Sequence, residues 1–181
     1  MNKALFLDRD GVINIDKGYV HKPEDCEFVD GIFELVKRAN DLNYKVIIVT
    51  NQAGIARGYY TEDQFKSFSE WMQQKFQERN SKIDHIYYCP HHPESGLGKY
   101  LARCECRKPR PGMFMQAKID FNLEMESSLM IGDNITDLQA AKSASVGELY
   151  LFNDYPKEGI GNLQLDIPYR KLANFSDIKL L

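Results

Sequence analysis

No stretch of this chain is apolar over the roughly 20 residues that a membrane-spanning helix requires. The sequence also lacks an excess of basic residues. It has 23 lysines and arginines against 26 aspartates and glutamates, a net charge of −3, whereas nucleic-acid-binding domains usually have a basic face. Its first residues do not form the pattern of a secretory signal peptide. We therefore expect a cytoplasmic protein that binds neither nucleic acid nor a membrane.

Internal repeats, low-complexity tracts and interdomain linkers are absent as well. A chain of 181 residues is long enough for one domain with a full hydrophobic core, so we predict a single domain over residues 1–181. No insertion of domain size follows the first predicted strand, which argues against a large cap domain. Because the sequence has no long heptad pattern and no obvious apolar stripe, we expect a monomer.

The chain does contain short apolar runs that alternate with helical segments. The predicted strands are residues 4–7, 45–49, 85–88, 129–131 and 149–152, with a final strand at 163–167. The predicted helices are residues 32–42, 61–79, 111–121 and 136–144. The first two strands are continuous apolar runs, as expected for strands covered on both faces. This alternation predicts an α/β fold, a mostly parallel Rossmann-like sheet with helices on both faces.

The first predicted strand ends in two aspartates, Asp8 and Asp10, followed by Gly11. Residues i and i+2 of an extended chain project to the same side, so one carboxylate can attack a phosphorus atom while the other transfers protons. A dianionic phosphate ester requires a divalent cation beside such a pair, and oxygen ligands favour magnesium. Taken alone, the motif is equally consistent with an acidic turn at the end of a strand.

Polar residues also end two other predicted strands. Thr50 and Asn51 end the second strand and can donate hydrogen bonds to phosphate oxygens, although alone they favour a simple turn. Asp133 and Asn134 follow the fourth strand, where Asp133 would supply a third oxygen ligand or merely cap the next helix. Parallel sheets bind ligands at the carboxyl ends of their strands, near a topological switch point. We therefore expect these residues to share one site.

Three of the four cysteines lie close together in the sequence, in a Cys-x-His and a Cys-x-Cys pair. In a reducing compartment such clustering indicates a metal rather than disulfides. Three thiolates and one imidazole make a closed, structural zinc site, so we predict a zinc-binding loop over residues 89–106. The predicted ligands are Cys89, His91, Cys104 and Cys106. The alternatives are His92 in place of His91, and a chance grouping without metal.

Together, Asp-x-Asp-Gly at 8–11, Thr-Asn at 50–51, Lys108 before a proline and Gly-Asp-Asn at 132–134 resemble the haloacid dehalogenase superfamily of aspartyl-phosphate phosphatases. The resemblance covers most of the chain and implies a HAD-type sheet. It implies that Asp8 is the nucleophile, that Asp10 is the general acid/base, and that Thr50 and Lys108 stabilise the transferring phosphoryl group. The implied magnesium ligands are Asp8, Asp10 (through its carbonyl group) and Asp133, with Asn134 as a further candidate.

Within this superfamily, the zinc-loop residues and segments 16–21 and 54–58 are similar to the heptose 1,7-bisphosphate 7-phosphatase family. The similarity implies removal of the 7-phosphate from a small sugar bisphosphate in ADP- or GDP-heptose biosynthesis. The implied substrate-binding residues are Asp16, Lys17, Gly18, Tyr19, Thr50, Asn51, Gln52, Ala53, Arg107 and Lys108. Arg107 is suited to a second phosphate, because a guanidinium group binds phosphate oxygens bidentately.

Two residues depart from the family pattern. Asn134 stands where a basic residue is expected after the metal aspartate, and Arg110 stands where such enzymes can have histidine. Histidinol-phosphate phosphatases are the rival family, since they share the catalytic residues and zinc cysteines, but their zinc loop is typically shorter. A non-catalytic sugar-phosphate sensor is the remaining alternative, although no catalytic residue is missing.

Overall fold

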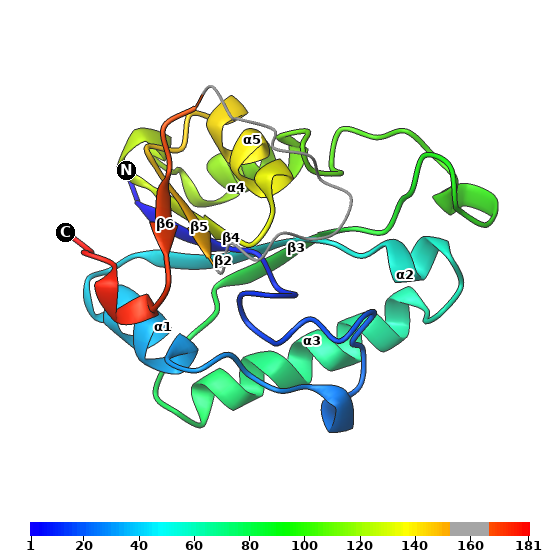
Figure 1. Ribbon diagram of the computed structural model, residues 1–181, viewed down its shortest axis with the longest axis horizontal. Helices are drawn as coiled ribbons and strands as arrows, with labels where there is room; N and C mark the ends of the chain where they lie inside the picture. Colours follow the sequence, from blue (N-terminus) through cyan, green and yellow to red (C-terminus); the bar gives the residue numbers. More distant parts are fainter. Residues whose placement is uncertain (153–166) are drawn as a thin grey trace.

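The computed structural model describes residues 1–152 and 167–181, which form a six-stranded sheet covered by helices (Figure 1). The strands are β1 (Ala4–Leu7), β2 (Lys45–Asn51), β3 (His85–Cys89), β4 (Leu129–Gly132), β5 (Glu148–Phe152) and β6 (Arg170–Leu172). The α-helices are α1 (Ile32–Asp41), α2 (Ala53–Ala56), α3 (Glu62–Gln77), α4 (Gly112–Phe121) and α5 (Ile135–Ser143). Short 3-10 helices are η1 (Pro23–Asp25), η2 (Gly98–Tyr100), η3 (Met125–Ser127) and η4 (Phe175–Asp177). The predicted α/β fold is confirmed.

The strands are all parallel and follow the order β3-β2-β1-β4-β5-β6. After β1 the chain adds β2 and β3 on one side, and then returns to place β4 on the other side of β1. The direction of winding therefore changes between β1 and β4, which makes this the topological switch point. Leu7, the last residue of β1, pairs with Ile48 on one side and with Ile131 on the other. The residues that follow these strands therefore start from neighbouring positions at one edge of the sheet.

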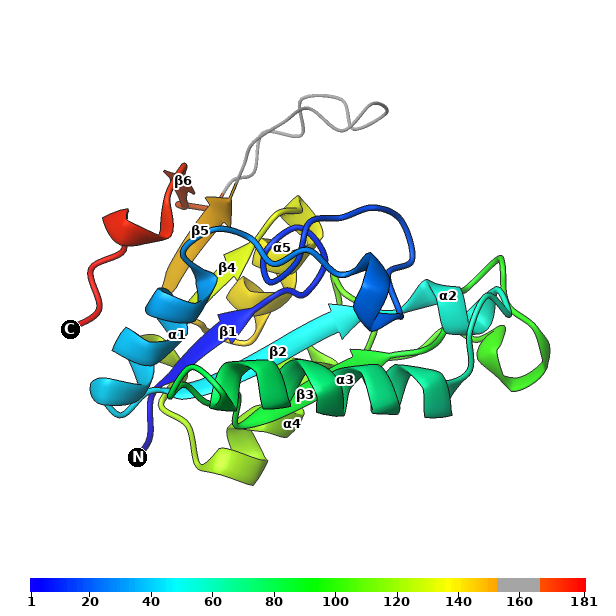
Figure 2. The ribbon, with the colours of Figure 1, turned by 90° about the horizontal axis from the view of Figure 1, so that it is seen from below.

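The side chains of the sheet alternate between two hydrophobic cores. Leu5 and Leu7 belong to the core shared with α1 and α3, whereas Ala4 and Phe6 belong to the core shared with α4 and α5. Figure 1 shows these helix pairs on opposite sides of the sheet, and Figure 2 shows α1 and α3 along the same face. All four β1 side chains are fully buried, as expected for a strand covered on both faces.

Helices α3 and α5 both begin with a capping box, in which two residues satisfy each other's free backbone N–H groups. The Thr61 hydroxyl accepts from the Gln64 N–H, and the Gln64 side chain accepts from the Thr61 N–H. Asn134 and Asp137 form the corresponding box at the start of α5. Loss of such a cap typically costs about 1 kcal/mol. The second box also fixes the Asp137 carboxylate beside the end of β4.

The expected strands and helices begin and end within one or two residues of the observed ones, but two elements were not expected. Helix α2 is a single turn, too short to show helical periodicity. Strand β6 contains the exposed Arg170 and Lys171, so it lacks the apolar pattern of a strand. The strand expected at 163–167 lies outside the described residues except for Ile167, which is in a bend before β6.

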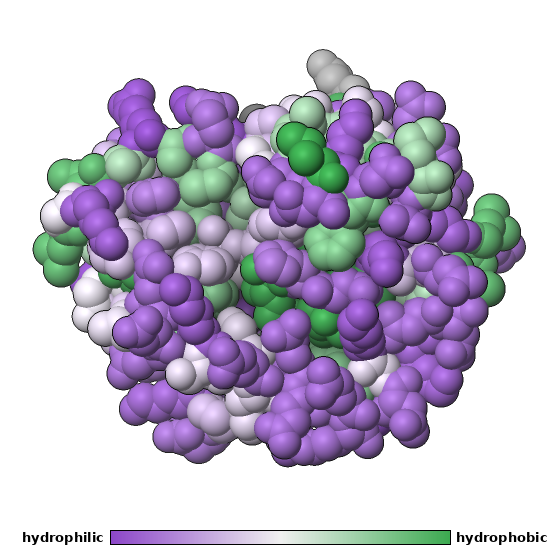
Figure 3. Space-filling view, turned by 180° about the vertical axis from the view of Figure 1, so that it is seen from behind, coloured by the Kyte–Doolittle hydropathy of each residue, from purple (hydrophilic) through white to green (hydrophobic). Residues whose placement is uncertain are grey.

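Within the described residues, none of the helices combines the length and the apolar character that crossing a membrane requires. The face of the molecule seen from behind is mostly hydrophilic, with hydrophobic residues in separate patches (Figure 3). Among large exposed hydrophobic side chains, Leu97 lies beside η2 and Ile119 lies on α4. Met115 is also exposed, one turn before Ile119 on α4.

Candidate active site

A pocket of about 400 Å³ lies at the carboxyl ends of β1, β2 and β4. Asp8, Thr50 and Asp133 enter it from the three strand ends, as expected from the sequence. The pocket is lined by every residue predicted to act in catalysis or substrate binding except Lys17. The Lys17 ammonium group instead forms an exposed ion pair with Glu27 at 2.9 Å.

A buried lysine lies between two buried carboxylates at the floor of the pocket. The Lys108 Nζ atom is 2.8 Å from Asp8 Oδ1 and 2.7 Å from Asp137 Oδ1, and it also donates to the Val49 carbonyl oxygen at 2.7 Å. Lys108 is 4% exposed and Asp137 is 2% exposed. Burial lowers the pKa of Lys108, but the carboxylates of Asp137 and Asp8 raise it by more, so the net shift is upwards. Lys108 is therefore a permanent cation where a phosphoryl group would meet Asp8.

The Asp8 carboxyl group has a raised pKa of about 6, first because it is buried and second because Asp137 is close. Lys108 opposes both effects through its charge and its hydrogen bond. A carboxylate that is shielded from water yet paired with a cation is poorly solvated and directed at the pocket. Such a group is suited to nucleophilic attack on phosphorus.

Three carboxylates are close enough to hold one divalent cation. Oxygen atoms of Asp8, Asp133 and Asp137 all lie within 4.8 Å of one another. The backbone at Gly11 passes directly against them, because a Cβ added there would be 2.1 Å from Asp133 Oδ2, and its φ of +90° also favours glycine. This oxygen-only donor set fits magnesium.

Two of the predicted magnesium ligands belong to this group of carboxylates, and two do not. Asp8 and Asp133 belong to the carboxylate group, together with Asp137, which was not predicted. The Asp10 carboxylate is outside it, which leaves for Asp10 the backbone carbonyl that the family resemblance implies. The Asn134 amide oxygen accepts hydrogen bonds from Thr136 at the start of α5. Its position after Asp133 therefore serves as a helix cap.

The Asp10 carboxylate is held by donors from several directions. Arg9, whose side chain is almost fully buried, donates to both oxygens at 2.9 and 3.0 Å. Asn14 donates to Oδ1 at 3.1 Å and Gln52 donates to Oδ2 at 3.2 Å. The Arg9 guanidinium group also lies over the rings of Phe65 and Phe68. Asp10 is thus fixed at the pocket wall, two residues from Asp8, by groups that would hold a general acid/base in place.

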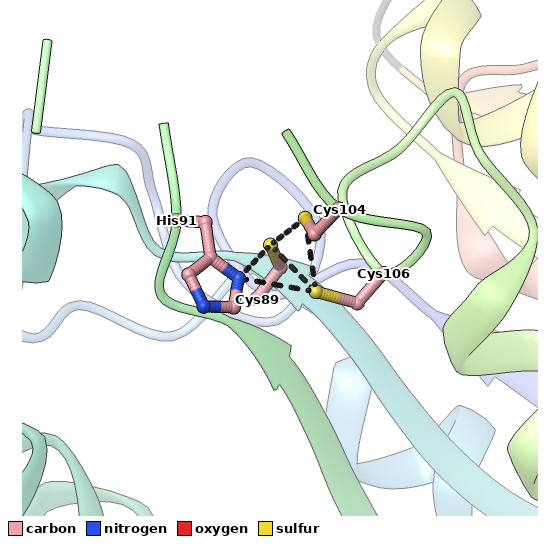
Figure 4. Close-up of side chains that lie close together, drawn as sticks. All are labelled: Cys89, His91, Cys104 and Cys106. Carbon is pink, nitrogen blue, oxygen red and sulfur yellow. Dashed lines mark hydrogen bonds between the residues drawn. The ribbon is translucent and has the colours of Figure 1, made fainter. Parts of the chain in front are cut away.

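The predicted metal-binding cysteines and histidine converge beside the pocket (Figure 4). The Cys106 sulfur is 3.0 Å from that of Cys89 and 3.2 Å from that of Cys104, and the Cys89 sulfur is 3.7 Å from His91 Nδ1. These separations exceed the roughly 2.05 Å of a disulfide and approach the roughly 3.8 Å between thiolates around tetrahedral zinc, from a Zn–S distance of about 2.3 Å. The donor set therefore fits a closed zinc site. His92 is not part of the cluster, because its Nδ1 accepts from the N–H groups of Glu94 and Ser95.

The cysteine cluster is tied to Lys108 through β2. Asn51 pairs with Cys89 in the sheet register. The Asn51 side chain accepts from the Lys108 N–H at 3.0 Å and donates to the Lys108 carbonyl oxygen at 3.2 Å. Arg107 donates to the His91 carbonyl oxygen at 3.3 Å. The segment that follows Cys106 is therefore fastened on both sides where it enters the pocket.

Sequence reasoning missed Arg9 and Asp137, and also Gly54, Tyr60 and Thr136, which line the pocket. Arg9 is buried although arginine is usually exposed, and its position between two aspartates was the only available signal. Asp137 stands four positions after Asp133, and both line the pocket from the start of α5. That spacing could have marked Asp137 as a partner for a buried cation.

A parallel sheet that gathers aspartates and a lysine around one small pocket at its switch point is the arrangement of haloacid dehalogenase-type phosphatases. The fold and the site place the chain in this class. Comparisons with known proteins show which family within this class the chain belongs to. A family model described as polynucleotide kinase 3 phosphatase matches residues 4–147.

Two bacterial relatives are similar over most of their length. D-glycero-beta-D-manno-heptose-1,7-bisphosphate 7-phosphatase of Vibrio cholerae is 49% identical over 144 residues, which cover 80% of this chain and 77% of the relative. The D-glycero-alpha-D-manno-heptose-1,7-bisphosphate 7-phosphatase of Campylobacter jejuni is 53% identical over 157 residues, which cover 87% of this chain and 86% of the relative. The chain therefore belongs to the polynucleotide kinase 3 phosphatase family and to the family of these heptose-1,7-bisphosphate 7-phosphatases.

A solved structure agrees with this assignment. The crystal structure of D,D-heptose 1,7-bisphosphate phosphatase from B. bronchiseptica, complexed with magnesium and phosphate, matches with a TM-score of 0.80 and 28% identity. The match covers 96% of this chain and 94% of that chain. The family predicted from the sequence is confirmed.

Proposed function

We propose that this chain is a magnesium-dependent phosphatase that removes the 7-phosphate of D-glycero-D-manno-heptose 1,7-bisphosphate through an aspartyl-phosphate on Asp8. The observation that carries the proposal is the buried contact of Asp8 with Lys108, 2.8 Å apart at the floor of a pocket also lined by Asp10 and Thr50. The names of the relatives support the substrate and favour it over histidinol phosphate.

In the first half of the reaction, Asp8 attacks the phosphorus atom and forms a new bond from its carboxylate oxygen. The bond from phosphorus to O7 of the sugar breaks, and Asp10 gives its proton to that oxygen, which leaves as an alcohol. Lys108 and Thr50 stabilise the phosphoryl oxygens while they pass between the two partners. Phosphoryl transfer depends mainly on such positioning and charge stabilisation.

In the second half, Asp10 takes a proton from a water molecule, which attacks the phosphorus atom of the aspartyl-phosphate. The bond between Asp8 and phosphorus breaks, inorganic phosphate leaves, and the Asp8 carboxylate is restored. Asp10 ends the cycle protonated and ready to act as the acid again. One residue can perform both proton transfers because Arg9, Asn14 and Gln52 hold its carboxylate at the pocket wall.

Magnesium bound by Asp8, Asp133 and the Asp10 carbonyl group would supply positive charge that lets a dianionic phosphate approach carboxylates. Asp137 lies within reach of the same position. The support for magnesium is the oxygen-only donor set and the magnesium in the B. bronchiseptica structure. We assign zinc to Cys89, His91, Cys104 and Cys106, where a closed ligand set makes its role structural.

Arg107 is the residue we assign to the second phosphate of the substrate. It lines the pocket next to Lys108, and a guanidinium group can bind two phosphate oxygens at once. A distant anchor of this kind would favour a bisphosphate over a monophosphate. The remaining proposed substrate contacts are Asp16, Gly18, Tyr19, Asn51 and Ala53, which all line the pocket.

We further propose that the chain acts in the cytoplasm as a monomer, without nucleic-acid or membrane partners. Its net charge of −3 supports this, as does the mostly hydrophilic face in Figure 3. A cytoplasmic location also suits the cysteine cluster, because reduced thiols bind zinc.

The direct test measures phosphate release with magnesium from the alpha and beta heptose 1,7-bisphosphates and from histidinol phosphate, for the wild type and Asp8→Asn. We expect kcat/KM for one heptose anomer to exceed that for histidinol phosphate by more than tenfold, and the variant to release no phosphate. Equal or faster turnover of histidinol phosphate would transfer the assignment to that substrate. Absence of turnover on all three would favour a sugar-phosphate sensor.

A further inference from the structure

Tyr60 lies beneath the active-site pocket, at the point where the chain enters α3. Its side chain is buried and its position is fixed from both sides. The His21 ring stacks on the Tyr60 ring with centroids 4.5 Å apart and planes 14° apart. On the other side the ring fills the space that a side chain at position 54 would need, because a Cβ at Gly54 would be 2.2 Å from Tyr60 Cε1. Burial also raises the pKa of Tyr60, so the hydroxyl keeps its proton.

The Tyr60 hydroxyl is in hydrogen-bond contact with Oε1 of Gln52. The other end of that amide, Nε2, donates to Asp10 Oδ2 at 3.2 Å and to Thr50 Oγ1 at 2.9 Å. The direction of each bond follows from the chemistry, because the amide nitrogen only donates and the amide oxygen only accepts. The amide nitrogen must therefore face Asp10, the amide oxygen must face Tyr60, and the Tyr60 hydroxyl must donate.

Gln52 was expected to bind substrate, yet both ends of its side chain bond within the protein and it is 2% exposed. Its amide instead links the proposed general acid/base to the threonine that stabilises the phosphoryl group. We infer that Tyr60 is a positioning residue for phosphoryl transfer: its hydroxyl anchors the oxygen end of the Gln52 amide, whose nitrogen end holds Asp10 and Thr50 together. This inference rests on the proposed function, because its effect is read in turnover.

Without the Tyr60 hydroxyl, the buried Gln52 amide oxygen loses its hydrogen-bond donor, although Asp10 still favours the same amide orientation. Reversing the amide gives no relief, because its oxygen would then point at the Asp10 carboxylate, where two acceptors repel each other. Asp10 would keep Arg9 and Asn14 as donors to its carboxylate, so the side chain would lose part of its support and not all of it. Tyr60→Phe should therefore lower kcat by roughly 2- to 12-fold, the equivalent of one net hydrogen bond, while KM changes little.

The test uses two substrates that depend differently on Asp10. An alkyl oxygen such as O7 of the heptose needs a proton as it leaves, whereas p-nitrophenolate is a stable anion and needs little acid catalysis. Tyr60→Phe should reduce kcat/KM for the heptose bisphosphate more than for p-nitrophenyl phosphate. Equal losses on both substrates, or no loss at all, would overturn the inference.

The matched control is Tyr88→Phe. The Tyr88 hydroxyl donates to Glu62 at 3.1 Å, and its ring packs on the same small hydrophobic cluster of Ile55, Tyr60 and Phe65. This variant removes the same chemical group close to α3 without touching the pocket, so it should match the wild type in kcat and in its ratio between the two substrates. A loss equal to that of Tyr60→Phe would show that packing, and not the amide, is responsible.

A double-mutant comparison tests whether Gln52 transmits the effect. Gln52→Met keeps the length of the side chain but removes the amide. If Tyr60 acts through that amide, adding Tyr60→Phe to Gln52→Met should change turnover by less than about twofold, because coupled residues are not additive. Losses that multiply fully would overturn the inference. Failure of the wild type to release phosphate from any ester would refute the proposed function instead, since the inference concerns only ratios between variants and wild type.

Discussion

The buried contact between Lys108 and Asp137 allows a stability prediction to be worked out from the structure. Asp137→Asn keeps the volume of the side chain, and its amide oxygen can still accept the Asn134 N–H at the start of α5. The change therefore removes one negative charge and little else. In the absence of magnesium it leaves Lys108 paired with Asp8 alone.

The magnitude follows from one attraction and two repulsions that act on the Asp137 carboxylate. At 2.7 Å and an effective dielectric constant of about 20, the attraction between Lys108 and Asp137 is about 6 kcal/mol. The repulsions from Asp8 and from Asp133, whose oxygens lie within 4.8 Å of those of Asp137, are each at least about 3.5 kcal/mol on the same scale. Burial and these repulsions outweigh the attraction to Lys108, so the pKa of Asp137 is raised. We therefore expect Asp137→Asn to raise the free energy of unfolding by about 1–3 kcal/mol.

The assay is urea unfolding of wild type and variant at pH 8 with EDTA, followed by far-UV circular dichroism. With an m-value of about 2 kcal/mol per molar urea, the expected gain shifts the midpoint up by roughly 0.5–1.5 M. Asp41→Asn is the matched control, because Asp41 also pairs with a lysine at 2.9 Å but lies on the surface. Such exposed pairs contribute less than about 1 kcal/mol, so its midpoint should barely move.

Two outcomes would refute this reasoning. If Asp137→Asn were less stable than the wild type, the attraction to Lys108 would be larger than the repulsion and burial terms that oppose it. If Asp41→Asn gained as much stability as Asp137→Asn, burial would not be what makes the charge interactions of Asp137 strong. Either result would require a different account of the charge balance at the floor of the pocket.

Three further outcomes are expected. Asp8→Asn should abolish turnover, below the detection limit of a phosphate-release assay, while its circular dichroism spectrum and unfolding midpoint show an intact fold. Metal analysis by mass spectrometry should find one zinc per chain in the wild type and in His92→Ala, but not in Cys104→Ser; loss of zinc from the His92 variant would contradict the ligand set in Figure 4. Arg107→Ala should raise KM for the heptose bisphosphate more than for a sugar monophosphate, and equal increases would remove its assignment to the second phosphate.

The fold and most of the pocket were predictable because they depend on signals that are local in sequence. Continuous apolar runs such as residues 4–7 identify strands buried on both faces. Because parallel strands end at the same edge of a sheet, the polar residues after them could be expected to meet without knowing the strand order. Asp8, Thr50 and Asp133 were found in this way.

The features that the sequence did not reveal depend on which side chains are buried and on where those side chains point. Asp137 looks like an ordinary helix-capping acid, and only the structure shows that it is buried against Lys108. Gln52 follows a strand end as a substrate-binding residue would, and nothing in the sequence indicates that its amide faces inwards. Helix α2 and strand β6 were missed because they are short, and β6 also has exposed basic residues.

The structure also limits how strongly the cysteine cluster can control the position of Lys108. The Lys108 backbone donates one hydrogen bond to the Asn51 side chain and accepts another from it, and the Lys108 ammonium group is held by Asp8 and Asp137. None of these partners belongs to the cysteine cluster. Zinc removal should therefore reduce turnover without abolishing it, by loosening the segment around Arg107 and raising KM more than it lowers kcat. The measurement is steady-state kinetics with magnesium after zinc has been chelated and the folded protein re-isolated. Complete loss of kcat in a chain that is still folded would show that zinc, and not Asn51, determines the position of Lys108.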